Sequence, residues 1–541
     1  MKIKFTLTAM FALLCLNIQI ANAQSFKWSV KMNSSNANSA DVSAASIAVN
    51  QSGKLLIAGK DNGYGGTQSL FVRKYDSSGV SSPIWESTGL LAGNIGEGYF
   101  DSRDLALDQQ GNIFMGGFYQ NFLRFGTDTL KASNWNMIDF FITKFTPNGQ
   151  YLWSRKGASN YNMSLTSIAK GDSSSVLVAG TAQWVIYIGS DTLPGGVFLA
   201  KYDASGNYLW SKSVVSTTTT LYPYIASDDN GNTFLLRGKI LSEGDYGFKL
   251  VKYDMNGNIV DSAQGVSGMG ANSFPKCITR DESGNIYAAG EFSGNLIVNN
   301  DTLTAQNSSD LFLIKYDSSL GYQWSKRYAG KNLTAISLTT GPNRELALCG
   351  SFNDTMKIAG DTLVGSGYND DIFIIIYDSA SVVTQTHRIT GLSSGTLTKF
   401  SGSDIAFDGV GNLYITGTFE GKIVFDGAKP IEQWSPTVSR GFIARIESYS
   451  SSASAVFDQT PDTKYTIYPN PNNGNFNLKI SKFENLKMVK IQIYNVLGDV
   501  VFSKQPSTNN EQLSTNLTSG IYFIQVSNEN NIISNQKIII Q

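Results

Sequence analysis

The segment that decides the fold reads Phe198-Leu-Ala-Lys-Tyr-Asp203, followed by Gly206 and by Trp210-Ser211. An apolar stretch runs into a glycine-containing turn, and a second stretch carrying a tryptophan follows, which is typical of two antiparallel strands. The phrase recurs along the chain, and the last copy is the weakest. The seven copies begin at Phe71, Phe141, Phe198, Lys249, Phe312, Phe373 and Phe442.

A second phrase precedes each copy and predicts two more strands. It is an apolar stretch, a turn and another apolar stretch that ends near a glycine, clearest over 105–117, 281–290 and 405–417. The Gly-Asn pairs in these turns suit tight hairpins because both residues tolerate positive φ. Each unit therefore holds four strands in hairpin succession, here called a to d. Such units repeated around an axis predict an all-β, seven-bladed β-propeller over residues 24–446.

The spacing of the copies exceeds the about 40–50 residues of a bare blade. The surplus lies between strands b and c, where four units carry the tripeptide Asp-Thr-Leu. Apolar residues flank a two-residue turn at this point, so the insert is predicted to be a small extra hairpin. The four copies occupy 128–130, 191–193, 301–303 and 361–363.

The two ends of the array complement each other. Phe26-Lys27-Trp28-Ser29 resembles a d strand with no a, b or c strand before it, whereas the seventh unit lacks a d strand. An N-terminal strand that closes the last blade removes two exposed edges. The units resemble the bacterial β-propeller repeats called SBBP repeats, over about residues 26–446.

The N-terminal residues 1–23 have the pattern of a secretory signal peptide. Lys2 and Lys4 precede an apolar core, and small residues end at Ala23, so cleavage is expected between Ala23 and Gln24. A lipoprotein reading through Cys15 is disfavoured because Leu14 stands where a small residue is needed. No later stretch reaches eighteen apolar residues, so the mature chain has no predicted transmembrane segment.

A Ser-rich linker is predicted over 447–464, and a strand-rich block over 465–541. Its motif residues, in order, are Tyr468, Pro469, Asn470, Pro471, Gly474, Phe476, Gly498, Gly520, Tyr522 and Lys537. With these motifs, the block resembles the type A C-terminal sorting domain of type IX (Por) secretion substrates. The resemblance implies a small Ig-like β-sandwich, recognition by the type IX secretion machinery, and a secreted or outer-surface protein of a Gram-negative bacterium that passes through the periplasm. The alternative is an ordinary adhesive Ig-like domain.

The charge balance excludes one class of partner. The 42 Lys and Arg nearly cancel the 43 Asp and Glu, so no basic excess exists to bind a phosphate backbone, and no nucleic acid is expected. Cys277 and Cys349, the cysteines of the mature chain, fall in apolar strand patterns and are predicted to be buried free thiols, with a disulfide as the alternative. We expect a monomer without a cofactor.

Catalytic signals are sparse, and no catalytic or metal-binding residue is assigned. The sole histidine, His387, aligns with basic residues of other units and is expected to face solvent. Gly391 to Gly395 matches a nucleophile-elbow pattern but lies between blades without a helix. The segment 228–232 invites a calcium interpretation, yet it occupies an ordinary a–b turn, which is the favoured interpretation.

Long, variable b–c and d–a connections emerge on one face of the predicted disc, and binding residues tend to lie in such loops. Their aromatic side chains are the candidates for ligand binding. The sequence favours a non-enzymatic protein that binds a glycan or a surface protein. The alternatives are a polysaccharide hydrolase or lyase, or a structural surface component, and the rings can also pack between blades. The candidates are Trp135, Trp184, Trp434, Tyr99, Tyr161 and Tyr222.

Overall fold

A computed structural model describes most of the chain, and all its described secondary structure is β. The chain divides into two compact units, Met1–Tyr449 and Ser450–Gln541. The described residues are 26–33, 39–63, 68–79, 83, 85–90, 99–172, 175–216, 221–242, 245–268, 270–358, 361–367, 370–392, 400–426, 429–432, 438–447, 465–468, 474–480, 489–495, 500–508, 510–518, 520–528 and 531–540.

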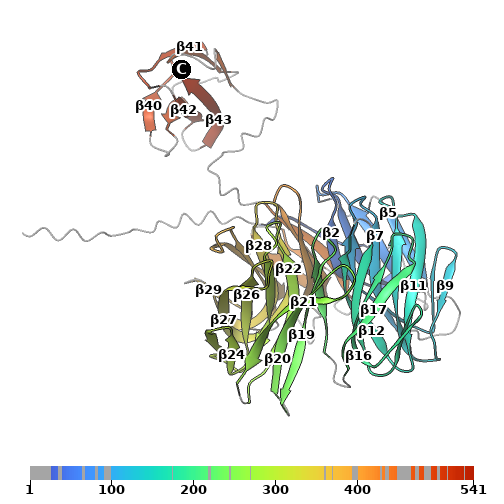
Figure 1. The fold of residues 1–541 in the computed structure, drawn as a ribbon. Helices are drawn as coiled ribbons and strands as arrows, with labels where there is room; N and C mark the ends of the chain where they lie inside the picture. Colours follow the sequence, from blue (N-terminus) through green and yellow to red (C-terminus); the bar gives the residue numbers. More distant parts are fainter. Residues whose placement is uncertain are drawn as a thin grey trace, which may run out of the picture. The chain divides into compact units, whose positions relative to one another are not determined.

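The strands of the first unit form sets of four antiparallel neighbours, as the repeat predicts (Figure 1). The long strand β27 supplies the last strand of one set and the first of the next. In chain order the sets are β2 (Ser39–Val49), β3 (Leu55–Gly63), β4 (Gln68–Tyr75) and β5 (Trp85–Leu90); β6 (Phe100–Leu107), β7 (Ile113–Gln120), β10 (Ile138–Phe145) and β11 (Tyr151–Ser159); β12 (Met163–Lys170), β13 (Val176–Ala182), β16 (Gly196–Tyr202) and β17 (Tyr208–Ser216); β18 (Tyr224–Ser227), β19 (Thr233–Ser242), β20 (Asp245–Tyr253) and β21 (Ile259–Ser267); β22 (Ser273–Arg280), β23 (Ile286–Phe292), β26 (Asp310–Tyr316) and β27 (Tyr322–Thr340); β27 again, β28 (Leu346–Ile358), β30 (Asp371–Tyr377) and β31 (Val383–Leu392); and β32 (Phe400–Phe407), β33 (Leu413–Phe419), β36 (Arg440–Ile446) and β1 (Phe26–Lys31).

The sets follow one another in a propeller-like arrangement. The first strand of each set contacts the first strand of the next, in the order β2, β6, β12, β18, β22, β27 and β32, and β32 contacts β2. The apolar side chains of neighbouring sheets are buried between the sets, which is where the cores lie. The first strands therefore surround a central axis.

The N-terminal strand β1 takes the outer position of the last set, as predicted from its sequence. It pairs with β36, with Val30 opposite Ile443 and Lys31 opposite Phe442. Phe26 is buried against Phe425, with ring centroids 5.1 Å apart. Residues at the two ends of the repeat thus share one sheet.

The predicted extra hairpins are present, and three of them bridge two sets. Their first strands pair with the outer strand of the preceding set, while the Asp of their Asp-Thr-Leu binds the outer strand of its own set. Asp191, for example, accepts hydrogen bonds from the hydroxyls of Tyr208 and Ser211. In the fourth, residues 361–364 pair with β28, and a further hairpin over 422–432 pairs with β31. The insert strands are β8 (Phe122–Phe125), β9 (Asp128–Lys131), β14 (Ile186–Ile188), β15 (Asp191–Leu193), β24 (Asn295–Val298), β25 (Asp301–Thr304), β29 (Asp361–Val364), β34 (Lys422–Phe425) and β35 (Ile431–Glu432).

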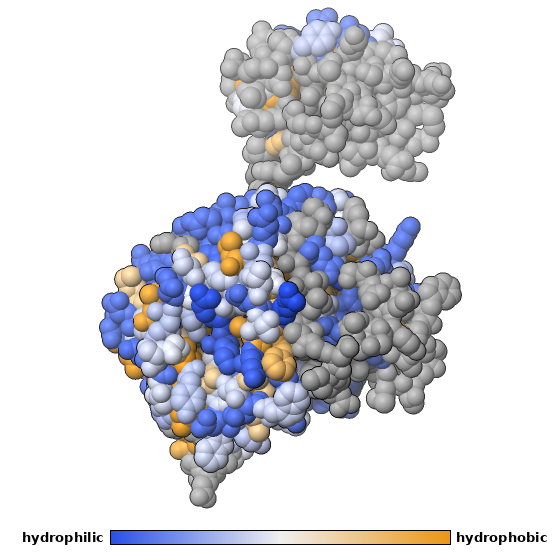
Figure 2. All heavy atoms as spheres, turned by 90° about the vertical axis from the view of Figure 1, so that its right-hand side faces the viewer, coloured by the Kyte–Doolittle hydropathy of each residue, from blue (hydrophilic) through white to orange (hydrophobic). Residues whose placement is uncertain are grey.

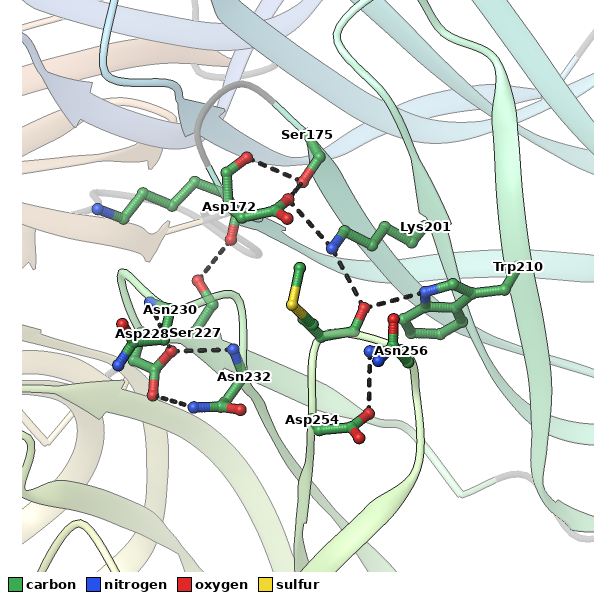
Figure 3. Close-up of polar contacts among 12 residues, drawn as sticks. Asp172, Ser175, Lys201, Trp210, Ser227, Asp228, Asn230, Asn232, Asp254 and Asn256 are labelled. Carbon is green, nitrogen blue, oxygen red and sulfur yellow. Dashed lines mark hydrogen bonds and ion pairs between the residues drawn. The ribbon is translucent and has the colours of Figure 1, made fainter.

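In the first four sets, the repeated Lys donates a hydrogen bond to a backbone carbonyl in the c–d turn of the following set, and Figure 3 shows this for Lys201. The Lys201 ammonium lies 3.0 Å from Asp172 and donates to the Met255 carbonyl, and the Trp210 indole N–H donates to the same carbonyl. Met255 belongs to the c–d turn of the following set. The recurring phrase therefore encodes contacts between sets as well as strands.

The second unit consists of two sheets that share one buried apolar cluster. The motif residues Phe476 and Tyr522 lie in this cluster, so they have a packing role. Gly474 has φ +91°, and a Cβ there would lie 2.7 Å from the Thr515 carbonyl oxygen, which explains the glycine. The strands are β37 (Tyr465–Tyr468), β38 (Asn475–Ile480), β39 (Val489–Tyr494), β40 (Val500–Lys504), β41 (Asn510–Ser514), β42 (Gly520–Asn528) and β43 (Asn531–Ile540).

Several predicted features lie outside the described residues. They are the signal segment with Ala23 and Gln24, most of the linker, 393–395, Trp434, 469–471 and Gly498. Gly520 begins β42, and Lys537 pairs with Phe523 in the ladder of β42 and β43. Within the described parts of the chain, no helix has the length and apolarity needed to cross a membrane.

The solvent-facing position expected for His387 is wrong. Its side chain is 2% exposed and packs against the Phe26 ring, with centroids 5.5 Å apart. Burial lowers the pKa of the imidazole to about 4, and Nε2 lies 2.8 Å from the Gln385 side-chain oxygen. The alignment with basic residues failed because β1 covers this part of the sixth set, a contact between residues far apart in sequence.

Candidate functional site

A hollow of about 710 Å³ lies where the first strands of the sets begin, on the side of the b–c and d–a connections. We call it the mouth hollow. Its lining comes from β2, β6, β12, β18, β22 and β32 and from the adjoining ends of β7, β10 and β13. It is therefore on the face that the sequence predicted for binding.

β-Bulges supply much of this lining. In the first strands of six sets the pairing register slips by one residue, which leaves one extra residue on that strand. A bulge turns a side chain out of the regular pleat, and bulges are common beside functional sites. Five of the six extra residues line the hollow: Ala45, Arg103, Thr166, Lys276 and Ser403.

At five of the six bulges, the residue that follows ties neighbouring first strands together below the hollow. Asp104 accepts hydrogen bonds from the Ile168 N–H at 2.7 Å and from Ser167 at 3.2 Å. Asp404 accepts from the Ile47 N–H at 3.0 Å and from the Ser46 hydroxyl at 2.8 Å. These acids therefore hold the ring of strands and have their oxygens occupied.

The environment of these acids favours their neutral form. Burial raises the pKa of Asp104 to about 7, assisted by the nearby charge of Asp404. Burial likewise raises the pKa of Asp404. Each of these buried carboxyl groups is therefore protonated more readily than a solvated one.

Tyrosine rings form the apolar part of the mouth hollow. Tyr99 is 55% exposed and Tyr222 is 53% exposed, and both line it together with Tyr224. The Tyr99 ring lies against Phe118 at 5.3 Å between centroids, which holds it in place. Burial raises the pKa of Tyr224, so its phenol stays protonated. Exposed, supported rings of this kind offer flat faces for stacking.

Three charged residues line the hollow: Asp101, Arg103 and Lys276. The Arg103 guanidinium lies over the Phe118 ring at 4.9 Å. Lys276 pairs with Glu291 at 3.6 Å. Burial raises the pKa of Asp101 and outweighs the opposing attraction of Arg103 and Lys60.

The structure divides the predicted aromatic candidates. It brings Tyr99 and Tyr222 together in the mouth hollow. Tyr161, Trp135 and Trp184 are exposed on the same side of the sets but do not line the hollow. Trp135 is 57% exposed and Trp184 is 63% exposed, so packing between sets does not bury either ring.

Sequence reasoning missed Arg103 and Lys276, the cations of the lining. Their bulges depend on pairing between strands, and the sequence of one strand carries no mark of them. The signal that could have found them is the alignment of the repeats, because each lies one position before the repeat position that Asp104 and Asp404 occupy.

Residues 228–232, for which calcium binding was the alternative interpretation, form a turn, as the sequence predicted (Figure 3). Asp228 accepts hydrogen bonds from the N–H groups of Asn230 and Asn232 and from the Asn232 side-chain amide. Among the residues described, no group of three or more His, Cys, Asp or Glu could hold a metal ion. Cys277 and Cys349 are free and buried, as predicted.

The outer surface of the first unit shows no single large apolar patch in the view of Figure 2. Apolar residues there form small, separated spots among hydrophilic ones. Single exposed apolar residues are normal on soluble proteins. The mouth hollow is therefore the better-defined candidate site.

The first unit thus has an all-β, propeller-like fold with a polar and aromatic hollow at its axis. Residues 466–541 match the family described as "Secretion system C-terminal sorting domain". This match indicates export through type IX secretion to the cell surface or the extracellular space. No curated protein sequence matches the chain.

Solved structures give remote similarities. A subtype N11 neuraminidase-like protein of A/flat-faced bat/Peru is 11% identical, with 76% of this chain and 98% of that chain covered and a TM-score of 0.35. Drosophila Semaphorin 2a is 10% identical, covering 96% and 99%, with a TM-score of 0.35. A duf4221 family member from Bacteroides vulgatus is 11% identical, covering 65% and 99%, with a TM-score of 0.31. Such low TM-scores carry no information on function.

Proposed function

We propose that the protein is an exported, non-enzymatic binding protein whose first unit is a closed seven-bladed propeller presenting the mouth hollow to a glycan. The contacts of successive first strands, including β32 with β2, support closure. The pairing of β1 with β36 supports the N-terminal strand as the last blade's outer strand. The SBBP-type repeat is part of this proposal.

The observation that carries the glycan assignment is the combination of exposed tyrosine rings with hydroxyl and amide groups around one hollow. Tyr99 and Tyr222 offer faces on which the C–H groups of a sugar ring can stack. Ser43, Ser164 and Gln183 add donors and acceptors for sugar hydroxyls. Hollows of about 300–1,000 Å³ suit ligands of the size of one to a few sugar residues.

A glycoside hydrolase is the weaker candidate. Such enzymes use two carboxyl groups about 5–10 Å apart. Asp101 is the one carboxylate in the described lining of the mouth hollow. The nearby Asp104 and Asp404 already accept hydrogen bonds from backbone and serine groups of neighbouring strands, which supports a structural role for them.

The C-terminal match supports the finer proposals for export. We propose cleavage between Ala23 and Gln24, a linker over 447–464, and a type A sorting domain over 465–541 with an Ig-like sandwich fold. The two sheets around one core support the sandwich. Export by a Gram-negative bacterium, through the periplasm to its surface or surroundings, is part of the proposal.

The test is oligosaccharide binding by the mature chain, measured by calorimetry against a panel of neutral and acidic tetrasaccharides. Tyr222→Ala and Tyr99→Ala should each weaken binding by at least about fivefold, since one stacked ring contributes about 1 kcal/mol or more. Tyr187→Ala is the matched control, because Tyr187 is exposed on β14 and does not line the hollow. Unchanged binding in the first two variants, with loss in Trp135→Ala or Trp184→Ala, would move the site to the outer loops.

A further inference from the structure

The two cations of the mouth hollow reach it from different sides of the ring of strands. Arg103 is the extra bulge residue of β6, and Lys276 is the extra residue of β22. The first strands β12 and β18 stand between them in the order of contacts. The equivalent bulge residues at Ala45, Thr166 and Ser403 are uncharged, so these two positions distinguish the hollow chemically.

Arg103 is free to bind a ligand. Its side chain is exposed and rests on the Phe118 ring at 4.9 Å, which orients the planar guanidinium. Within the described part of the chain, no carboxylate oxygen lies at ion-pair distance from Arg103. A guanidinium held by an aromatic ring retains its donors for a planar anion.

Two carboxylates lie near these cations, and both are partly buried. Glu291, which pairs with Lys276 at 3.6 Å, has its pKa raised by burial, which outweighs the attraction of Lys276. Burial also raises the pKa of Asp101 beside Arg103. Within the described lining, the two cations Arg103 and Lys276 face one carboxylate, Asp101, so the lining carries an excess of positive charge.

Resting on the proposed function, we propose that the mouth hollow selects an acidic oligosaccharide, whose anionic groups bind Arg103 and Lys276 while a sugar ring stacks on Tyr222. A carboxylate or a sulfate can supply the anion, since both offer acceptor oxygens to a guanidinium and an ammonium. Arg103 and Lys276 are then the residues that determine specificity, and the tyrosines supply binding common to all sugars.

The experiment measures the affinity of the mature chain for three probes: tetragalacturonic acid, a chondroitin sulfate tetrasaccharide and the neutral cellotetraose. At least one acidic probe should bind at least about tenfold more tightly than cellotetraose. Arg103→Gln and Lys276→Gln should each lower that acidic affinity about tenfold and leave cellotetraose binding unchanged. The preferred acidic probe identifies the anionic group.

Lys239→Gln is the matched control, because Lys239 is a half-buried lysine of β19 that bonds Gln264 and lies outside the lining. It should leave all affinities unchanged. Equal binding of neutral and acidic probes, with no effect of the Arg103 and Lys276 variants, would overturn acidic specificity and leave the proposed function standing. Binding of none of the probes would overturn both proposals.

Discussion

Replacing Phe26 by alanine tests how much the N-terminal strand contributes to the stability of the first unit. The ring is 1% exposed and lies 5.1 Å from the Phe425 ring and 5.5 Å from His387. Truncating a buried phenylalanine costs about 3–5 kcal/mol, because transfer energy is lost and a cavity remains. With an unfolding entropy of about 2.1 cal/mol/K per residue, a cooperative unit of roughly 400 residues should melt about 4–6 °C lower.

The assay is calorimetric melting of the mature chain, with Phe274→Ala as the control. Phe274 is a phenylalanine of β22 that is 44% exposed, so its truncation should shift the melting temperature by much less. Deleting residues 24–33 should destabilise the unit more than Phe26→Ala, since it also opens the edge of β36. An unchanged melting temperature in Phe26→Ala would refute the role assigned to β1.

Three further predictions follow from the interior and the tail. Gly206→Ala should destabilise the first unit more than Gly53→Ala. Both glycines have positive φ, but only at Gly206 would a Cβ lie 2.6 Å from a tryptophan ring, that of Trp153. Urea unfolding of the two variants measures the difference, and equal losses of stability would refute the role of this contact. The pKa of Asp104 is about 7 in the folded protein and about 3.9 in the unfolded chain. The contribution of its protonated carboxyl group to the free energy of unfolding is therefore full below about pH 4 and is lost as pH rises through 7. Asp104→Asn should therefore reduce the loss of stability between pH 5 and pH 8, and an unchanged pH profile would contradict this. Residues 465–541, fused with a signal peptide to a passenger, should carry it across the outer membrane of a type IX-competent host, and retention in the periplasm would count against the sorting role.

The strand pattern could be predicted from the sequence because neighbouring residues in each repeat carry the signals for its turns and strands. Gly206 and the Asp203 of the c–d turn mark a tight turn, and the apolar stretches mark strands. The orphan segment at Phe26 predicted the pairing of β1 with β36 across the whole repeat, because a missing strand at one end matched a surplus strand at the other.

The prediction for His387 failed, and Arg103 and Lys276 were missed, for a common reason. Their surroundings depend on contacts between sets, which a single repeat does not encode. Phe26 covers His387 from the other end of the chain. The bulges that place Arg103 and Lys276 in the mouth hollow depend on the register of paired strands. The face that carries the mouth hollow was predictable from loop length, whereas the chemistry of the hollow was not.

The most direct test of the central claim, that the mouth hollow binds the ligand, is to map where the ligand attaches. The tightest-binding oligosaccharide of the panel is given a photoactivatable diazirine group, cross-linked to the mature chain and located by peptide mass spectrometry. The account predicts cross-links in the segments that carry Tyr99 to Arg103 and Tyr222 to Tyr224, and their loss when unlabelled oligosaccharide competes. Cross-links confined to the turns of the opposite face, such as 228–232, would contradict it.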